Sequence, residues 1–156
     1  MDELIALARD LAPEPRLTGE VLAAALERAG WSVLRAGTGT AFPRVWQKGA
    51  LRAGIQGDGP GVRLSVTLWW REVEEDDEDF VALEALYDEA EAESRRAGER
   101  LDESLPGAPP EPAGGDPTDG LDYLHHRAWR LTNRTLLVGA IQHDNGLPVF
   151  VEAVIG

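Results

Sequence analysis

The sequence predicts an α+β protein with a single antiparallel sheet of about six to seven strands, onto which N-terminal helices and one long acidic helix pack. Three observations carry this prediction. Two amphipathic segments open the chain, a strictly alternating apolar pattern marks a strand at 62–70, and a long helical stripe separates it from a second strand-rich segment. A length of 156 residues suits one domain, residues 1–156, that buries a core without disulfides.

The first thirty residues contain two predicted helices. The first covers about residues 2–11 and ends before Pro13 and Pro15. The second begins at Thr18, with Glu20 close behind, and ends at Gly30. Its apolar face consists of Leu22, Ala25, Leu26 and Ala29.

A meander of four strands follows. WSVLRA forms the first strand, and RVWQ and ALRAGIQ flank a tight hairpin at Lys48-Gly49. After the turn GDGPG, the strand at 62–70 alternates and should pair antiparallel with residues 51–56. The alternation places Trp70 on the core face and Trp69 on the wetter face, where Trp69 either packs under another element or anchors a partner.

The second half of the chain repeats the order of helix and strands. A helix of about 25 residues runs from about Asp79 to Ser104. Half of the ten prolines fall in 106–120, which predicts a flexible loop. HHRAWRLT, TLLVGAIQH and LPVFVEAVI then form three strands, the last two joined by a turn at Asn145-Gly146. Residues 121–131 also fit a helical stripe, so a helix is the alternative there.

Composition excludes several classes of protein. The absence of cysteine rules out a disulfide framework, thiolate-bound zinc, iron–sulfur clusters and a cysteine nucleophile. The opening MDELIALARD has acids where a signal peptide needs bases, and no run approaches the ~20 apolar residues of a membrane span. A cytoplasmic protein is the expected class.

The net charge of −13 is concentrated in one part of the chain. Residues 72–105 hold 15 acids and 3 bases, a net of −12, and the other 122 residues hold a net of −1. Seven of the eight residues at 72–79 are acids, more than helix capping needs. Such a field attracts basic proteins and repels nucleic acid and anionic membranes. We predict a surface for a basic partner formed by Trp69, Glu74, Glu75, Asp76, Asp77 and Glu78; a solvated junction without a partner is the alternative.

No motif in the sequence predicts catalysis, a metal or a cofactor. Consecutive His125 and His126 in a strand would point to opposite faces, and Asp144 beside His143 belongs to a predicted turn. GTGTAF and GDGPG lack the ending of a phosphate-binding loop. The acidic run lacks the spacing of a calcium loop. We therefore expect a protein that is not an enzyme.

Two stretches carry a resemblance to known proteins. LAAALERAGW and HRAWRLTNRTLLVGAIQHDNGLPVFVEAVI, together with the meander and the acidic helix, resemble small actinobacterial α+β proteins. These include immunity-type proteins of polymorphic toxin systems and secretion-chaperone-like YbjN relatives. The resemblance implies a non-catalytic protein-binding module whose partner is a toxin or a secreted effector. A small-molecule or cation sensor, or an accessory subunit of an enzyme, is the alternative function.

Overall fold

The computed structural model describes residues 1–35, 44–57, 59–73, 80–105, 118, 120–144 and 147–156. The helices of this part of the chain are α1 (Asp2–Leu11), α2 (Gly19–Arg28), a short 3₁₀ turn at Gly59–Gly61, and α3 (Phe80–Ser104). Its strands are β1 (Ser32–Arg35), β2 (Val45–Lys48), β3 (Leu51–Gln56), β4 (Arg63–Arg71), β5 (Tyr123–Arg130), β6 (Thr135–Gln142) and β7 (Val149–Ile155). The predicted α+β class is confirmed.

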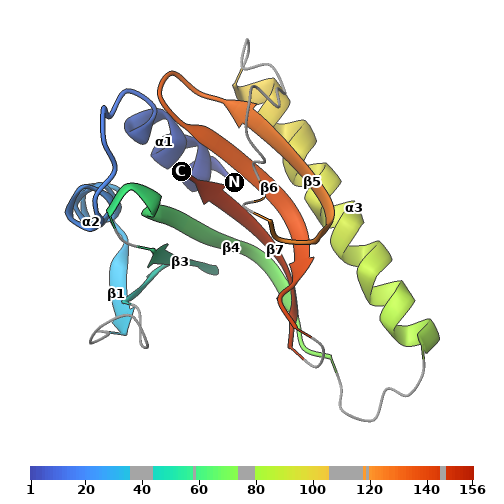
Figure 1. The fold of residues 1–156 in the computed structure, drawn as a ribbon. Coiled ribbons are helices and arrows are strands. Elements are labelled where there is room, and N and C mark those ends of the chain that lie inside the picture. The colour runs from blue at the N-terminus through green and yellow to red at the C-terminus, as the bar shows by residue number, and fades with distance from the viewer. Residues whose placement is uncertain (36–43, 58, 74–79, 106–117, 119, 145–146) are drawn as a thin grey trace.

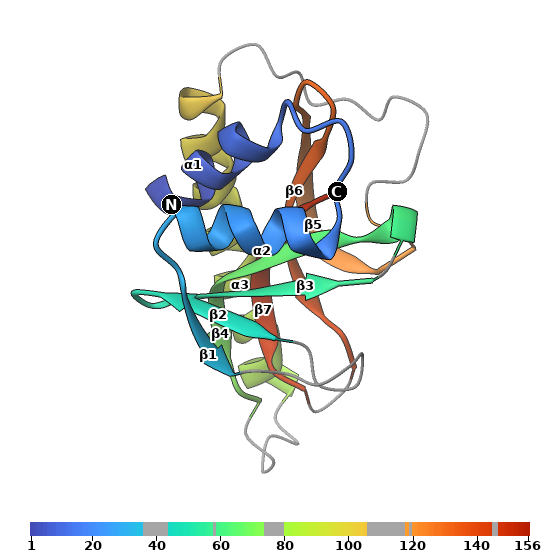
Figure 2. The same ribbon diagram turned by 90° about the vertical axis from the view of Figure 1, so that its left-hand side faces the viewer.

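The strands form one antiparallel sheet in the order β1-β2-β3-β4-β7-β6-β5 (Figure 1). Both predicted pairings are confirmed, since β3 pairs with β4 and β6 pairs with β7. The sheet twists strongly, so that β3 runs across the direction of β6 and β7 (Figure 2). Residues 123–130 form an edge strand and not a helix, because pairing along β6 satisfies their backbone groups.

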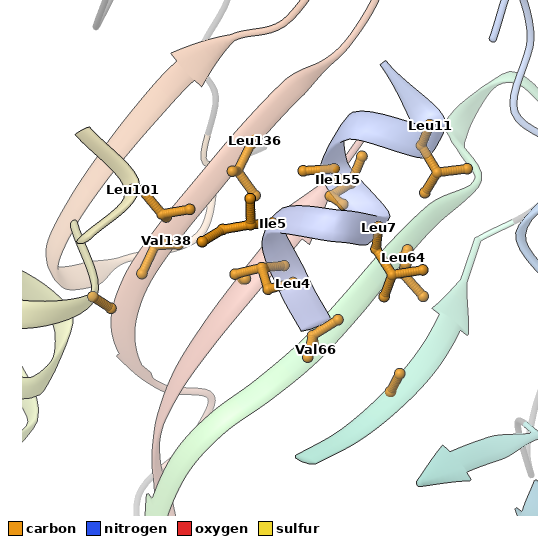
Figure 3. Packing of buried hydrophobic residues seen from close by; sticks show 14 of the residues in the cluster. Leu4, Ile5, Leu7, Leu11, Leu64, Val66, Leu101, Leu136, Val138 and Ile155 are labelled. Atoms are coloured by element: carbon orange, nitrogen blue, oxygen red, sulfur yellow. The ribbon is translucent and has the colours of Figure 1, made fainter. Parts of the chain in front are cut away.

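The three helices cover one face of the sheet. From α1, the side chain of Leu7 points toward Leu64 on the sheet (Figure 3). The side chain of Ile5 points toward Leu136 and Val138. The buried residues of α1 follow the spacing of a single helical stripe; they are Leu4, Ile5, Leu7, Ala8 and Leu11. The predicted packing of helices on one face therefore describes the main core.

The boundaries of α2 follow the residues that the sequence singled out. The Thr18 hydroxyl accepts a hydrogen bond of 3.2 Å from the backbone N–H of Val21, which caps the helix. Gly30 follows the helix with a φ of 77°, a conformation that glycine adopts without strain. The hairpin between β2 and β3 turns at Gly49-Ala50, one residue later than predicted, because Lys48 still pairs with Leu51.

The strict alternation predicted for residues 62–70 is wrong at its end. A β-bulge between Thr67 and Trp69 inserts Leu68 into β4 without a partner in β7. One extra residue reverses the faces of everything after it. Trp69 therefore pairs with buried Val151 on the helix-covered face, and Trp70 lies 40% exposed on the other.

Several predicted features lie outside the described residues. They include the acidic residues 74–79, most of the proline-rich loop at 106–120 and the Asn145-Gly146 turn. Within the described helices, none is long and apolar enough to cross a membrane.

Candidate functional site

The acidic surface predicted from the sequence begins where β4 ends. Glu74, Glu75, Asp76, Asp77 and Glu78 lie outside the described residues, whereas the elements on either side are defined. Before the run, β4 ends at Arg71 and the Glu72 side chain is exposed. After it, α3 begins at Phe80 and carries the remaining acids along 25 residues.

The predicted anchor Trp69 is half-buried. It packs against the core, and the guanidinium of Arg71 lies 5.4 Å from its ring centroid. Its neighbour Trp70 is the more accessible ring, with the guanidinium of Arg52 at 5.9 Å. Tryptophan and arginine are enriched among binding hot spots. The bulge therefore exchanges the environments that the alternation assigned to the two tryptophans.

Basic side chains already neutralise half of the described acids of α3. Glu91 and Glu93 pair with Arg95 and Arg96 one turn further along the helix. Glu89 lies 3.8 Å from Arg71, and the Asp102 carboxylate contacts Arg127 at 2.6 Å. The hydrogen bond and the negative charge of Glu93 raise the pKa of the Arg96 guanidinium. The four remaining acids of this helix are Glu84, Asp88, Glu99 and Glu103.

One exposed stripe combines acids with apolar side chains at the N-terminal end of α3. Val81, Glu84, Ala85 and Asp88 follow the spacing of a single helix face, and all four are exposed. Val81 is 70% exposed, the highest fraction among the exposed large apolar side chains of the described chain. In Figure 1 this end of α3, in light green, extends away from the strands. We call Glu72, residues 74–79 and this stripe together the acidic surface.

A second cluster, which the sequence reasoning missed, lies on the sheet face without helices. Glu152, only 6% exposed, accepts hydrogen bonds from the Ser65 hydroxyl at 2.9 Å and the Tyr123 hydroxyl at 2.8 Å. Burial, and then the nearby Glu152 charge, raise the pKa of Tyr123, which keeps the phenol neutral and a donor. The Tyr123 ring lies directly over Gly139. The signal in the sequence is the lone acid within the apolar run VFVEAVI.

The three histidine side chains have different neighbours and do not converge on one site. His125 faces α3, where its Nδ1 lies 3.0 Å from the Ser94 hydroxyl, and burial lowers its pKa. His126 is on the opposite face, with its ring 5.9 Å from that of Tyr123, as consecutive strand residues require. His143 lies beside Phe150, with ring centroids 6.0 Å apart.

The described residues bring no metal-ligating set together. They contain no group of three or more histidine, aspartate or glutamate side chains that could hold an ion. The Ser65 hydroxyl is buried and bonded to a carboxylate, which differs from a nucleophile held by a histidine base. Comparisons of the chain with protein-family models, curated proteins and solved structures gave no match.

Proposed function

We propose that this chain is a non-catalytic protein-binding module that docks a basic partner through its acidic surface. The partner is a toxin or a secreted effector, so the chain acts as an immunity-type inhibitor or as a chaperone. The supporting observation is the exposed stripe of α3, where Glu84 and Asp88 alternate with Val81 and Ala85. Acids supply electrostatic steering, and the exposed apolar side chains supply surface that a partner can desolvate.

The position of the acids favours steering over a purely structural role. Glu84 and Asp88 have the same sign and lie four residues apart, so they repel each other in the isolated helix. Half of the acids of α3 already have basic partners, and the remaining negative charge at its N-terminal end adds to the seven acids at 72–79. A basic protein that binds there relieves this repulsion.

A small-molecule sensor is the second candidate function, and one observation favours it. Within the described part of the chain, the buried Glu152 carboxylate accepts hydrogen bonds from two neutral hydroxyls, those of Ser65 and Tyr123. A buried anion of this kind is stabilised by an incoming cation. A cationic ligand on the second face of the sheet would therefore contact Glu152 instead of the acidic surface.

The test compares two variants with equal charge changes. Glu74, Glu75, Asp76 and Asp77 are replaced together by Ser in the first variant. The control variant replaces four exposed acids outside the acidic surface by Ser, namely Glu20, Glu27, Glu99 and Glu103. Each tagged protein is used to recover its basic partner from cells of its own organism, and association rates are then measured across a range of salt concentrations.

We expect the first variant to associate more slowly, with a flatter dependence on salt, while the control stays close to the original chain. Both variants should keep their stability, because the control residues are exposed and replacing the clustered acids relieves like-charge repulsion; we expect changes of about 0.5 kcal/mol for each substitution. Equal rates for the first variant and the original chain would contradict the proposal. Equal slowing in both variants would show that net charge, and not this surface, steers the partner.

A further inference from the structure

A pocket of about 270 Å³ lies between α3 and the sheet, separate from the acidic stripe. Its apolar lining comes from Leu51 of β3, Leu68 of β4, Val151 of β7, Ala97 of α3 and Met1 before α1. Leu68 is the residue that the β-bulge inserts without a partner in β7. Bulges occur next to functional sites because they re-aim a side chain, and here the bulged residue lines the pocket.

The charged part of the lining is basic on balance, in contrast to the chain as a whole. Arg96 and Arg100 lie four residues apart on α3, and both line the pocket with Glu93. Arg96 and Glu93 neutralise each other through two hydrogen bonds. Among the described residues, the Arg100 guanidinium forms an ion pair with Asp2 at 3.2 Å, and the Asp2 side chain is 91% exposed. An exposed pair of this kind contributes little, so the Arg100 guanidinium can exchange Asp2 for another carboxylate.

From this arrangement we propose that the pocket binds a short or medium-chain aliphatic carboxylate. The carboxylate pairs with the Arg100 guanidinium, a geometry that allows two parallel hydrogen bonds. The aliphatic chain covers Leu51, Leu68 and Val151, which line the pocket beside Ala97. The volume of about 270 Å³ is slightly below the ~300 Å³ at which sites for drug-sized ligands begin, so the ligand is a short or medium-chain carboxylate and not one with a long acyl chain.

The net charge of −13 does not oppose this binding at physiological salt. Screening limits the reach of exposed charges to about 8 Å at 0.15 M ionic strength. The nearby Arg100 guanidinium, whose partner Asp2 is exposed, therefore decides the sign of the charge that the ligand carries. The pocket involves a different part of α3 from the acidic surface. Its ligand can therefore be tested without the partner protein.

The test is an NMR titration of the ¹⁵N-labelled chain with octanoate, octanol and octylamine at 0.15 M salt. We expect saturable shifts of the Leu68, Ala97 and Val151 amides with octanoate, in the millimolar range of affinity that suits so small a ligand. Octanol should bind about tenfold more weakly and octylamine more weakly still, because only the carboxylate pairs with Arg100.

Two variants locate the site. Arg100→Gln should weaken octanoate about tenfold and leave octanol unchanged, while the matched control Arg95→Gln, on the same helix but outside the pocket, should change neither. Ala97→Leu should fill the pocket and abolish both shifts. The proposal is overturned if octanoate causes no saturable shifts, if octylamine binds as well as octanoate, or if both arginine variants behave alike. Should Ala97→Leu fail to fold, the three ligands and the arginine pair decide the outcome alone.

Discussion

Gly139 is the position where one added methyl group should test the second face of the sheet. A Cβ built on Gly139 would lie 2.3 Å from Cδ1 and 2.8 Å from Cε1 of Tyr123, and 3.0 Å from the backbone oxygen of His125. Real Cβ atoms do not approach other heavy atoms so closely, so the Tyr123 ring must move or the strands must part. The ring cannot move freely, because its hydroxyl donates to Glu152 at 2.8 Å.

The expected cost of Gly139→Ala follows from these contacts. If the Tyr123 ring stays in place, overpacking destabilises the fold by about 1–3 kcal/mol. If the ring moves, loss of its hydrogen bond to the Glu152 carboxylate destabilises the fold by about 1.5–3 kcal/mol. Alanine also lowers the conformational entropy of the unfolded chain, which stabilises the folded state by about 0.4–1 kcal/mol. We therefore expect Gly139→Ala to lower the free energy of unfolding by about 1–2 kcal/mol.

Urea unfolding measures this change, with two controls. Gly54 also lies in a strand, but apart from its chain neighbours no heavy atom of the described residues lies within 4 Å of a Cβ placed there, so Gly54→Ala should be neutral or slightly stabilising. In a Tyr123→Ala background the ring is gone, and most of the cost of Gly139→Ala should vanish. An unchanged midpoint for Gly139→Ala, or an equal loss with and without the ring, would refute the packing described for this face.

Three further predictions concern stability. Asp102→Ala should destabilise by about 1–3 kcal/mol in urea unfolding, because it leaves the indole N–H of fully buried Trp129 without its acceptor at 2.9 Å; the same change at exposed Glu103 should be neutral. Burial lowers the folded-state pKa of His125 below its usual 6.5, so unfolding free energy should fall as pH drops from 6.5, and less steeply in His125→Gln. A pH profile shared by both proteins would contradict that pKa. Thr18→Ala should cost about 1 kcal/mol by calorimetry through loss of the helix cap, and no change would mean that the cap is unimportant.

Local patterns predicted most of the fold because they agree with the tertiary packing. The stripe of α1, the stop at Gly30 and the pairing of residues 51–56 with β4 follow from spacing and turn chemistry. Residues 121–131 fitted both periods, and only the presence of β6 as a partner distinguishes strand from helix. A bulge has no signature in apolar alternation, so the reversal at Trp69 could not be predicted.

Less of the candidate site than of the fold could be predicted from the sequence. Charge counting found the acids of α3 but not which of them pair, since Arg71 and Arg127 come from strands distant in the chain. The cluster around Glu152 brings together side chains from β4, β5 and β7. The single acid in VFVEAVI does not predict that Ser65 and Tyr123 are its hydrogen-bond donors. Such contacts depend on strand order, which local patterns do not contain.

The most direct test of the protein-binding account is a map of where the recovered basic partner binds. The ¹⁵N-labelled chain is titrated with the unlabelled partner, and amide shifts are followed along the sequence. The account predicts shifts concentrated at residues 72–79 and at Val81, Glu84 and Asp88, and these shifts should weaken as salt rises. Shifts confined to the sheet face around Trp70, Tyr123 and Glu152, with the acidic surface unchanged, would contradict it.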